Sequence, residues 1–281
     1  MRKPALLLLA LAACGADFTP RSVLADLRVL ALVTAPLEAG PADSVTVRPV
    51  TLPGAGTGVV EERWSFCPLT TGASAGYACV AAACEFALAP APDGSVTLAP
   101  FALAQQCLAA AGAGGAPAAG VPAQVPDKVD SVVRYRVTAS DGQTREAVQV
   151  VPLYTRAAPL VRNAPPVVTG VTIGGAPVLG GARPPPLDAG GALEVRVTLD
   201  PASAEPYVDD AGNALAEALV VSFFTTAGRF DFDRGSGPDA RVELKDEAIL
   251  PGTGTAQLWA VARDGRGGET VVGPFQVALP R

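Results

Sequence analysis

The chain alternates short apolar segments with breaks rich in glycine and proline, and this pattern limits the folds that it can adopt. Of its 281 residues, 30 are glycine and 27 are proline. Short runs rich in valine between turn-forming residues are typical of β-strands. The clearest such segments are 26–35, 45–50, 62–67, 132–139, 147–153, 167–173, 193–199, 220–225, 258–262 and 270–277. The sequence therefore predicts an all-β protein.

Two stretches of the chain match each other around an Asp-Gly pair. Residues 135–146 (YRVTASDGQTRE) align with residues 258–269 (LWAVARDGRGGE) at an offset of 123 (258 − 135). A second match, Ser65-Phe66 with Ser222-Phe223, has an offset of 157 (222 − 65). The difference of 34 residues (157 − 123) indicates an insertion in the first copy. Asp-Gly favours a tight hairpin because glycine tolerates positive φ.

We therefore predict two tandem β-sandwich domains, over residues 27–155 and 167–281, joined by a linker at 156–166. The insertion of the first domain is expected at about 68–126, and a single larger β domain is the alternative. The Asp-Gly hairpins resemble those of bacterial immunoglobulin-like and PKD-like repeats. That resemblance implies two sheets packed face to face over an interleaved apolar core.

The start of the chain has a basic Met1-Arg2-Lys3, an apolar run, and then Leu11-Ala12-Ala13-Cys14. This tetrapeptide resembles the lipobox of bacterial lipoproteins. The resemblance implies removal of residues 1–13 as a signal peptide, thioether lipidation of Cys14, and acylation (palmitate) of the new amino group. The apolar run is far shorter than the ~20 residues of a membrane-spanning helix. An ordinary signal peptide and an apolar helix of a soluble protein are the alternatives.

Lipidation of Cys14 would place the protein in the bacterial cell envelope, attached to a membrane through its N-terminal lipid. Residues 14–26 are then expected to be a tether between the lipid and the fold. Gly15, where some lipoproteins have aspartate, implies by resemblance to lipoprotein sorting rules the outer membrane, on its periplasmic or surface face.

The composition argues against several classes of function. The formal net charge of −6 is unlike the basic footprint of a nucleic-acid-binding protein. The sequence also has no run of basic residues that would bind anionic lipid. It contains no histidine, which removes Ser-His-Asp and Cys-His catalysis and imidazole-bound zinc. We expect a protein that is not an enzyme and carries no cofactor.

Four cysteines remain once Cys14 is lipidated: Cys67, Cys79, Cys84 and Cys107. An even number of thiols in an oxidising compartment predicts disulfides, here two that staple the insertion. Three pairings are possible, and the sequence leaves them open. A Cys₄ zinc site is the rival interpretation, but the spacings contain no Cys-x₂-Cys pair.

Two acidic clusters are weak candidates for calcium. One contains Asp231, Asp233 and Asp239, and the other is the segment 209–213 (DDAGN). Closely spaced carboxylates beside glycine can wrap a Ca²⁺ ion. Aspartate and asparagine also favour turns by bonding their own backbone, and solvated turns without a metal are the preferred interpretation.

Together, the anchor, the repeat and the lack of catalytic groups predict a non-catalytic binding or structural module. Its expected partners are an envelope protein or a polysaccharide, and the insertion is the expected interaction surface. The alternative is a calcium-dependent or carbohydrate-binding adhesion protein. In that case the acidic loops, or Trp64 and Trp259 if they are exposed, would contact the ligand.

Overall fold

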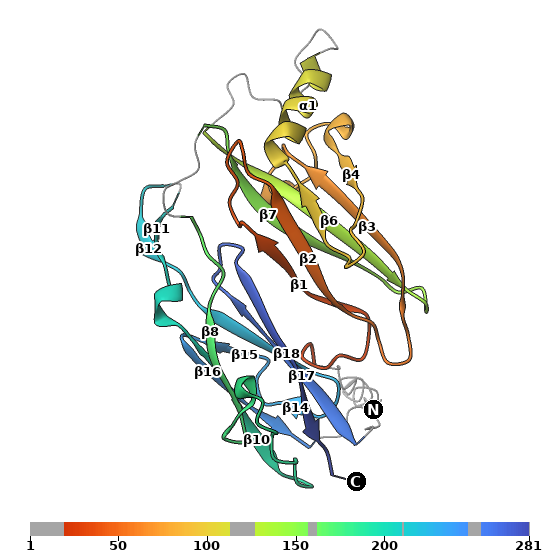
Figure 1. The fold of residues 1–281 in the computed structure, drawn as a ribbon, viewed down its shortest axis with the longest axis vertical. Coiled ribbons are helices and arrows are strands. Elements are labelled where there is room, and N and C mark those ends of the chain that lie inside the picture. The colour runs from red at the N-terminus through yellow and green to blue at the C-terminus, as the bar shows by residue number, and fades with distance from the viewer. Residues whose placement is uncertain (1–19, 113–126, 157–161, 210, 247–253, 281) are drawn as a thin grey trace, which may run out of the picture.

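The computed structural model describes residues 20–112, 127–156, 162–209, 211–246 and 254–280. These residues form two β-sandwiches, one from strands β1 to β7 and the other from strands β8 to β18 (Figure 1). Nearly all regular structure is strand, as the sequence predicts. Cys14 and the rest of residues 1–19 lie outside the described residues.

The first sandwich pairs a three-stranded sheet with a four-stranded sheet, and all neighbouring strands are antiparallel. The smaller sheet has the order β1 (Arg28–Ala35), β2 (Val45–Leu52), β5 (Val96–Leu98). The larger sheet has the order β4 (Phe86–Leu88), β3 (Val59–Cys67), β6 (Lys128–Ala139), β7 (Thr144–Tyr154). The first, second and fifth strands thus face the third, sixth and seventh, which is the immunoglobulin-like arrangement.

The second sandwich repeats this arrangement. One sheet has the order β14 (Arg229–Phe230), β16 (Asp239–Lys245), β10 (Ala192–Leu199), β8 (Val168–Ile173), β9 (Ala176–Pro177). The other has the order β15 (Arg234–Ser236), β13 (Val220–Thr225), β17 (Thr255–Arg263), β18 (Glu269–Ala278). A separate two-stranded arm consists of β11 (Pro206–Val208) and β12 (Ala214–Ala216).

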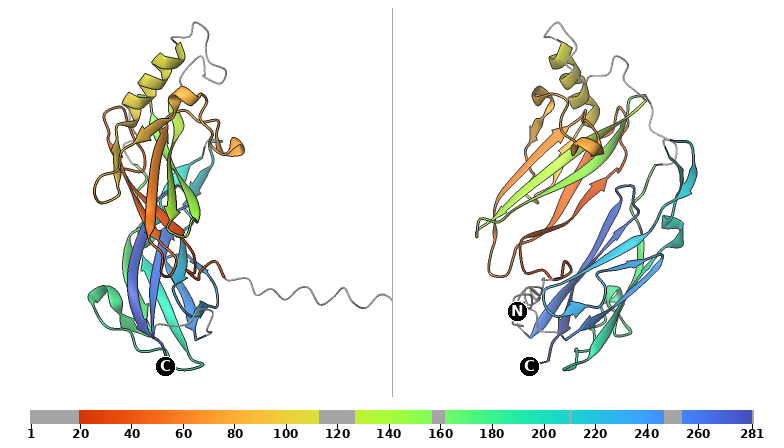
Figure 2. Two further views of the ribbon diagram at one scale, coloured as in Figure 1. Left: turned by 90° about the vertical axis from the view of Figure 1, so that its right-hand side faces the viewer. Right: turned by 180° about the vertical axis from the view of Figure 1, so that it is seen from behind.

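Helical structure is confined to one α-helix and four single turns among the described residues. Helix α1 (Pro100–Gly112) is rich in alanine, leucine and glutamine, which are good helix formers. It lies at the end of the first sandwich that points away from the second, as both views of Figure 2 show. The 3₁₀ turns are Ala73–Ala75, Ala82–Cys84, Val178–Gly180 and Pro201–Ser203.

Each sandwich has its own apolar core between its two sheets. Alternation along β6 points Val133, Tyr135 and Val137 inward, and the Tyr135 ring lies 4.4 Å from that of Trp64. The core of the second sandwich also contains an aromatic pair, Phe223 and Phe230, with ring centroids 5.8 Å apart. Two separate cores confirm the prediction of two β-sandwiches.

The internal sequence match corresponds to equivalent strands. Ser65-Phe66 lies in β3 and Ser222-Phe223 in β13, the third strand of each immunoglobulin-like arrangement. The two Asp-Gly pairs, at 141–142 and 264–265, lie in the turns between the last two strands of each sandwich.

The segment 68–126, expected as an insertion, has a mixed role. It supplies β4 and β5, which belong to the sandwich, together with the disulfide-linked turns and helix α1. Each of the two strands is only three residues long, so their alternation is too short to recognise in the sequence. Residues 113–126, which include most of the alanine-rich run, lie outside the described residues.

Candidate functional site: the junction of the two sandwiches

An apolar seam joins the two sandwiches. Leu24, Leu30 and Ala31 pack against Trp259 and Val261 of β17, and all five side chains are buried. Further apolar residues from both domains border the seam, namely Val33, Val50, Leu52, Phe224 and Val271. Burying such side chains contributes about 1.5–3 kcal/mol each, so the seam resists separation of the domains.

The N-terminal segment before β1 is part of this seam. Val23 forms a parallel β-bridge with Thr225, at the end of β13. The Leu24 N–H donates to the Thr225 carbonyl, and the Thr225 N–H donates to the Ser22 carbonyl, each over 2.8 Å. The second half of the expected tether, from residue 20 onward, therefore lies against the second sandwich. Its apolar residues Val23 and Leu24 explain the difference, because burying them in the seam is favourable.

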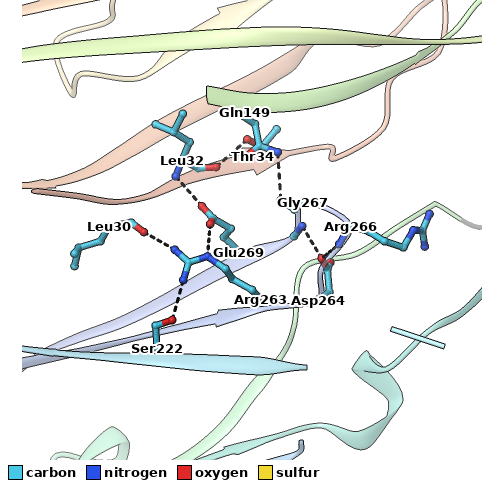
Figure 3. Close-up of polar contacts among 11 residues, drawn as sticks. Leu30, Leu32, Thr34, Gln149, Ser222, Arg263, Asp264, Arg266, Gly267 and Glu269 are labelled. Carbon is cyan, nitrogen blue, oxygen red and sulfur yellow. Dashed lines mark hydrogen bonds and ion pairs between the residues drawn. The ribbon is translucent and has the colours of Figure 1, made fainter. Parts of the chain in front are cut away.

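An ion pair from the second sandwich supplies hydrogen-bond partners to backbone groups at the unpaired edge of β1 (Figure 3). Arg263 Nε lies 2.6 Å from Glu269 Oε1. Arg263 Nη2 donates to the Leu30 carbonyl over 2.6 Å, and the Leu32 N–H donates to Glu269 Oε2 over 2.9 Å. The register of β1 with β2 shifts at Leu30, where a β-bulge interrupts the pairing. The two side chains thus replace a neighbouring strand at this edge.

Arg266 connects four parts of the junction. Its Nη2 lies 3.1 Å from Glu38 Oε1 in the first sandwich, and its Nη1 lies 3.0 Å from Glu217 Oε1. The guanidinium carbon lies 4.8 Å from the centre of the Tyr207 ring on the β11–β12 arm. The Arg266 carbonyl accepts a hydrogen bond from Asn163 Nδ2 over 3.5 Å. Both carboxylates are almost fully buried, so Arg266 compensates charge that water cannot reach.

The turn that carries Arg266 is held by Asp264. Asp264 Oδ1 accepts hydrogen bonds from the N–H groups of Arg266 (2.7 Å) and Gly268 (2.9 Å) (Figure 3). Gln149 Nε2 of the first sandwich donates to the Gly267 carbonyl over 3.2 Å. Burial, together with the nearby charge of Asp264, raises the pKa of Glu217, and Arg266 opposes this shift.

A groove with a volume of about 700 Å³, which we call the tyrosine groove, runs beside the junction. Three of the four tyrosines in the chain line it: Tyr77 from the disulfide-linked turns, Tyr154 from β7 and Tyr207 from the arm. Val148, Val150 and Pro152 also line it, and alternation along β7 places them on the same face as Tyr154. The groove therefore offers aromatic and apolar surface beside the charges of the junction.

The disulfides select one of the three possible pairings. Cys67, at the end of β3, is bonded to Cys79, and Cys84 is bonded to Cys107 in helix α1. The first bridge closes the turn that carries Tyr77, and the second joins helix α1 to the 3₁₀ turn Ala82–Cys84, which precedes β4. The insertion thus contributes Tyr77 to the lining of the tyrosine groove.

The acidic residues considered for calcium do not converge. Asp239 forms a bidentate ion pair with Arg196, with distances of 2.5 and 2.6 Å, and this contact lowers the pKa of Asp239. Asp231 Oδ1 accepts hydrogen bonds from the backbone N–H groups of Phe232 and Glu243. Asp233 lines a separate pocket beside the seam. No group of three or more potential metal-ligating cysteine, aspartate or glutamate side chains occurs in the described part of the chain.

The second acidic cluster closes its own turn. Asp209 accepts hydrogen bonds from the backbone and side chain of Asn213, and these bonds lower the pKa of Asp209. Asp210 lies outside the described residues. Trp64 and Trp259 are both buried, the first in a core and the second in the seam. Neither ring is available to stack on a sugar.

The sequence reasoning missed the residues that form the junction. Arg263, Arg266 and Glu269 flank an Asp-Gly pair that by itself predicts only a hairpin, and the one sequence signal for their role is their charge beside an apolar strand. Glu38 and Glu217 carry no such signal, because only the tertiary fold brings them to Arg266.

No protein-family model and no curated protein sequence match the chain. Solved structures similar to it include the D00-D0 domain of intimin, at 12% identity and a TM-score of 0.24, covering 91% of this chain and 99% of that one. Fibronectin(III)-like modules of Clostridium thermocellum CbhA match at 12% identity and a TM-score of 0.24, covering 90% and 92%. The Yersinia pseudotuberculosis adhesin InvE matches at 14% identity and a TM-score of 0.26, covering 91% of this chain and 59% of that one. The immunoglobulin-like assignment rests on the strand order given above.

None of the described helices has the length and apolar character needed to cross a membrane.

Proposed function

We propose that this protein is a lipid-anchored, non-catalytic binding module of the bacterial cell envelope, located at the outer membrane. The observation that carries the binding role is the tyrosine groove, which is built from both sandwiches and the disulfide-linked turns. The seam and the Arg266 contacts fix the walls of this groove relative to each other. A preformed groove lowers the entropic cost of binding.

The anchor is supported by the tetrapeptide at residues 11–14. Mass spectrometry of protein purified from membranes should show a mature chain that begins at Cys14 and carries a diacylglyceryl thioether and an amide-linked acyl chain. The Cys14→Ser variant should lose both modifications and leave the membrane fraction. An intact Met1, or an unmodified first residue after cleavage, would contradict the anchor.

The groove can be tested with a matched pair of photo-crosslinking positions in intact cells. Val208 borders the groove and its residue is 68% exposed, whereas Phe232 lies outside the groove lining and is 69% exposed. A photoreactive amino acid at position 208 should give a discrete adduct with an envelope component. The same amino acid at position 232 should not. Equal adducts at both positions, or none at position 208, would contradict binding in the groove.

A carbohydrate chain is the second candidate ligand. Three tyrosines line the groove, and aromatic rings commonly pack against sugar faces. An adduct at position 208 that glycosidases shorten but proteases do not would identify a polysaccharide. The reverse sensitivity would identify a protein partner.

A further inference from the structure

The seam contains a second hollow in which positive charge is concentrated. Its volume is about 490 Å³, and Arg21, Arg28, Arg234 and Arg263 line it together with a single carboxylate, Asp233. We call it the arginine pocket. The pocket stands out because the whole chain carries a formal net charge of −6.

The fold assembles this pocket from four distant parts of the chain. Arg234 on β15 is paired with Ser222 on β13, and Arg263 Nη1 donates to Ser222 Oγ over 3.2 Å. Arg234 and Arg263 therefore lie on the same face of the sheet. Arg28 begins β1, and Arg21 belongs to the N-terminal segment that bridges to the second sandwich.

Three of the four arginines are available to a ligand. Glu269 neutralises Arg263 across 2.6 Å. Within the described ranges, no ion pair joins Arg21, Arg28 or Arg234 to a carboxylate. The three unpaired arginines and Asp233 together give the pocket a net charge of +2 (3 − 1). Guanidinium groups bind phosphate oxygens with paired hydrogen bonds, so the pocket favours a phosphate-bearing anion.

We infer that the arginine pocket binds the headgroup of an anionic phospholipid of the membrane in which the protein is anchored. This inference rests on the proposed function, because it needs the lipid on Cys14. Arg21 is seven residues after Cys14, and an extended chain spans at most ~3.6 Å per residue. The rim of the pocket therefore stays within about 25 Å of the anchor.

Because the pocket lies close to the bilayer, its arginines would strengthen the attachment of the protein to an anionic membrane. Each arginine at an anionic membrane surface strengthens attachment about fivefold. The sequence contains no run of basic residues, so this contribution is invisible before folding. Binding would hold the junction side of the protein against the bilayer and orient the tyrosine groove relative to it.

Hydrogen–deuterium exchange of the anchored, full-length mature protein in nanodiscs tests the inference. The discs contain phosphatidylcholine alone or with 30% phosphatidylglycerol (roughly the anionic share needed for a clear surface potential). In the anionic discs, amides of residues 220–236 should exchange at least about fivefold more slowly, and 0.5 M salt (roughly a 4 Å Debye length) should abolish the difference.

Matched double variants separate the pocket from general charge. Arg28→Ala/Arg234→Ala should lose the protection, whereas Arg136→Ala/Arg241→Ala, which removes two exposed arginines elsewhere, should keep it. Arg28→Lys/Arg234→Lys retains the charge and controls for misfolding, and it should keep most of the protection. Equal protection in both disc types, or equal loss in both alanine variants, would overturn the inference.

Inorganic phosphate identifies the source of the anion. If phosphate added to phosphatidylcholine discs protects residues 220–236 as strongly as phosphatidylglycerol does, the pocket is a site for free phosphate and the lipid assignment is wrong. The mass of each sample separates the two proposals. An unlipidated Cys14 contradicts the proposed function, whereas a lipidated Cys14 with unchanged exchange contradicts the pocket alone.

Discussion

The two Asp-Gly turns have the same local chemistry and opposite surroundings. In each, the glycine has φ of 84°, and the aspartate Oδ1 accepts the N–H two residues on, from Gln143 at 3.0 Å and from Arg266 at 2.7 Å. Asp141 is exposed at the tip of its hairpin, whereas Asp264 is 1% exposed beneath the first sandwich. The Asp-Gly pair determines the conformation of each turn, whereas contact with the neighbouring domain determines whether the turn is buried.

The largest expected difference between the sandwiches comes from their disulfides. Both bridges lie in the first sandwich, with sequence separations of 12 and 23 residues. Reduction should cost that sandwich about 3 kcal/mol for each bridge, because the unfolded chain regains entropy. Native-state hydrogen exchange under reducing conditions should show the loss in β6, with a smaller change in β17. An equal loss in both strands would contradict a staple specific to the first sandwich.

Replacing Arg266 should break the junction on the second turn. Arg266→Ala leaves the buried carboxylates of Glu38 and Glu217 without their cation, which should lower the free energy of unfolding by about 3 kcal/mol. The equivalent residue of the first turn is Gln143 (266 − 123), which is only partly buried and whose side chain donates to the exposed contacts Asp141 Oδ2 and Asp26 Oδ1. Gln143→Ala should change stability by less than about 0.5 kcal/mol. Chemical denaturation gives the free energy of unfolding of both variants. A similar loss in both would contradict a special role for Arg266 at the junction.

A methyl group added at Gly268 should destabilise the second turn by steric overlap. A Cβ on Gly268 would lie 2.0 Å from Asp264 Oδ2 and 3.0 Å from Pro165 Cα. Gly268→Ala should therefore cost about 2 kcal/mol, since this packed site cannot expand freely. The equivalent position in the first sandwich is Arg145 (268 − 123), which lies exposed in β7 directly after the turn, and Arg145→Ala should be nearly neutral. A stable Gly268→Ala variant with an unshifted melting temperature would show that the turn is loosely packed.

The smallest expected effect is a pH dependence of stability. The pKa of Glu217 in the fold is raised above 4.5, so the folded state holds its proton more tightly than the unfolded state. This stabilisation is full below the unfolded pKa and is lost as the pH rises through the folded pKa. Glu217→Gln cannot ionise, and it should therefore flatten the profile and be at least as stable as the wild type at pH 7. Melting temperatures measured from below pH 4.5 up to neutral pH test this, and a variant less stable than the wild type at neutral pH would reverse the sign.

The sequence was informative wherever structure depends on local pattern. It predicted the all-β class, two sandwiches, and an even set of cysteines for disulfides. It missed β16, although Ala240, Val242 and Leu244 alternate with charged residues there, and it missed helix α1 beside the alanine-rich run. The pairing of cysteines, the Arg266 contacts and both hollows depend on residues far apart in the chain. Such contacts follow from the packing of the two domains, which no local pattern specifies.

The central claim is that the seam and the Arg266 contacts together hold the two sandwiches as one body, and a distance between the sandwiches tests it most directly. Spin labels carried by non-natural amino acids at the exposed positions 136 and 241, one in each sandwich, avoid the cysteines. Double electron–electron resonance should give a single narrow distance distribution for the wild type and a broad one for Arg266→Ala. A broad distribution in the wild type itself would contradict the account.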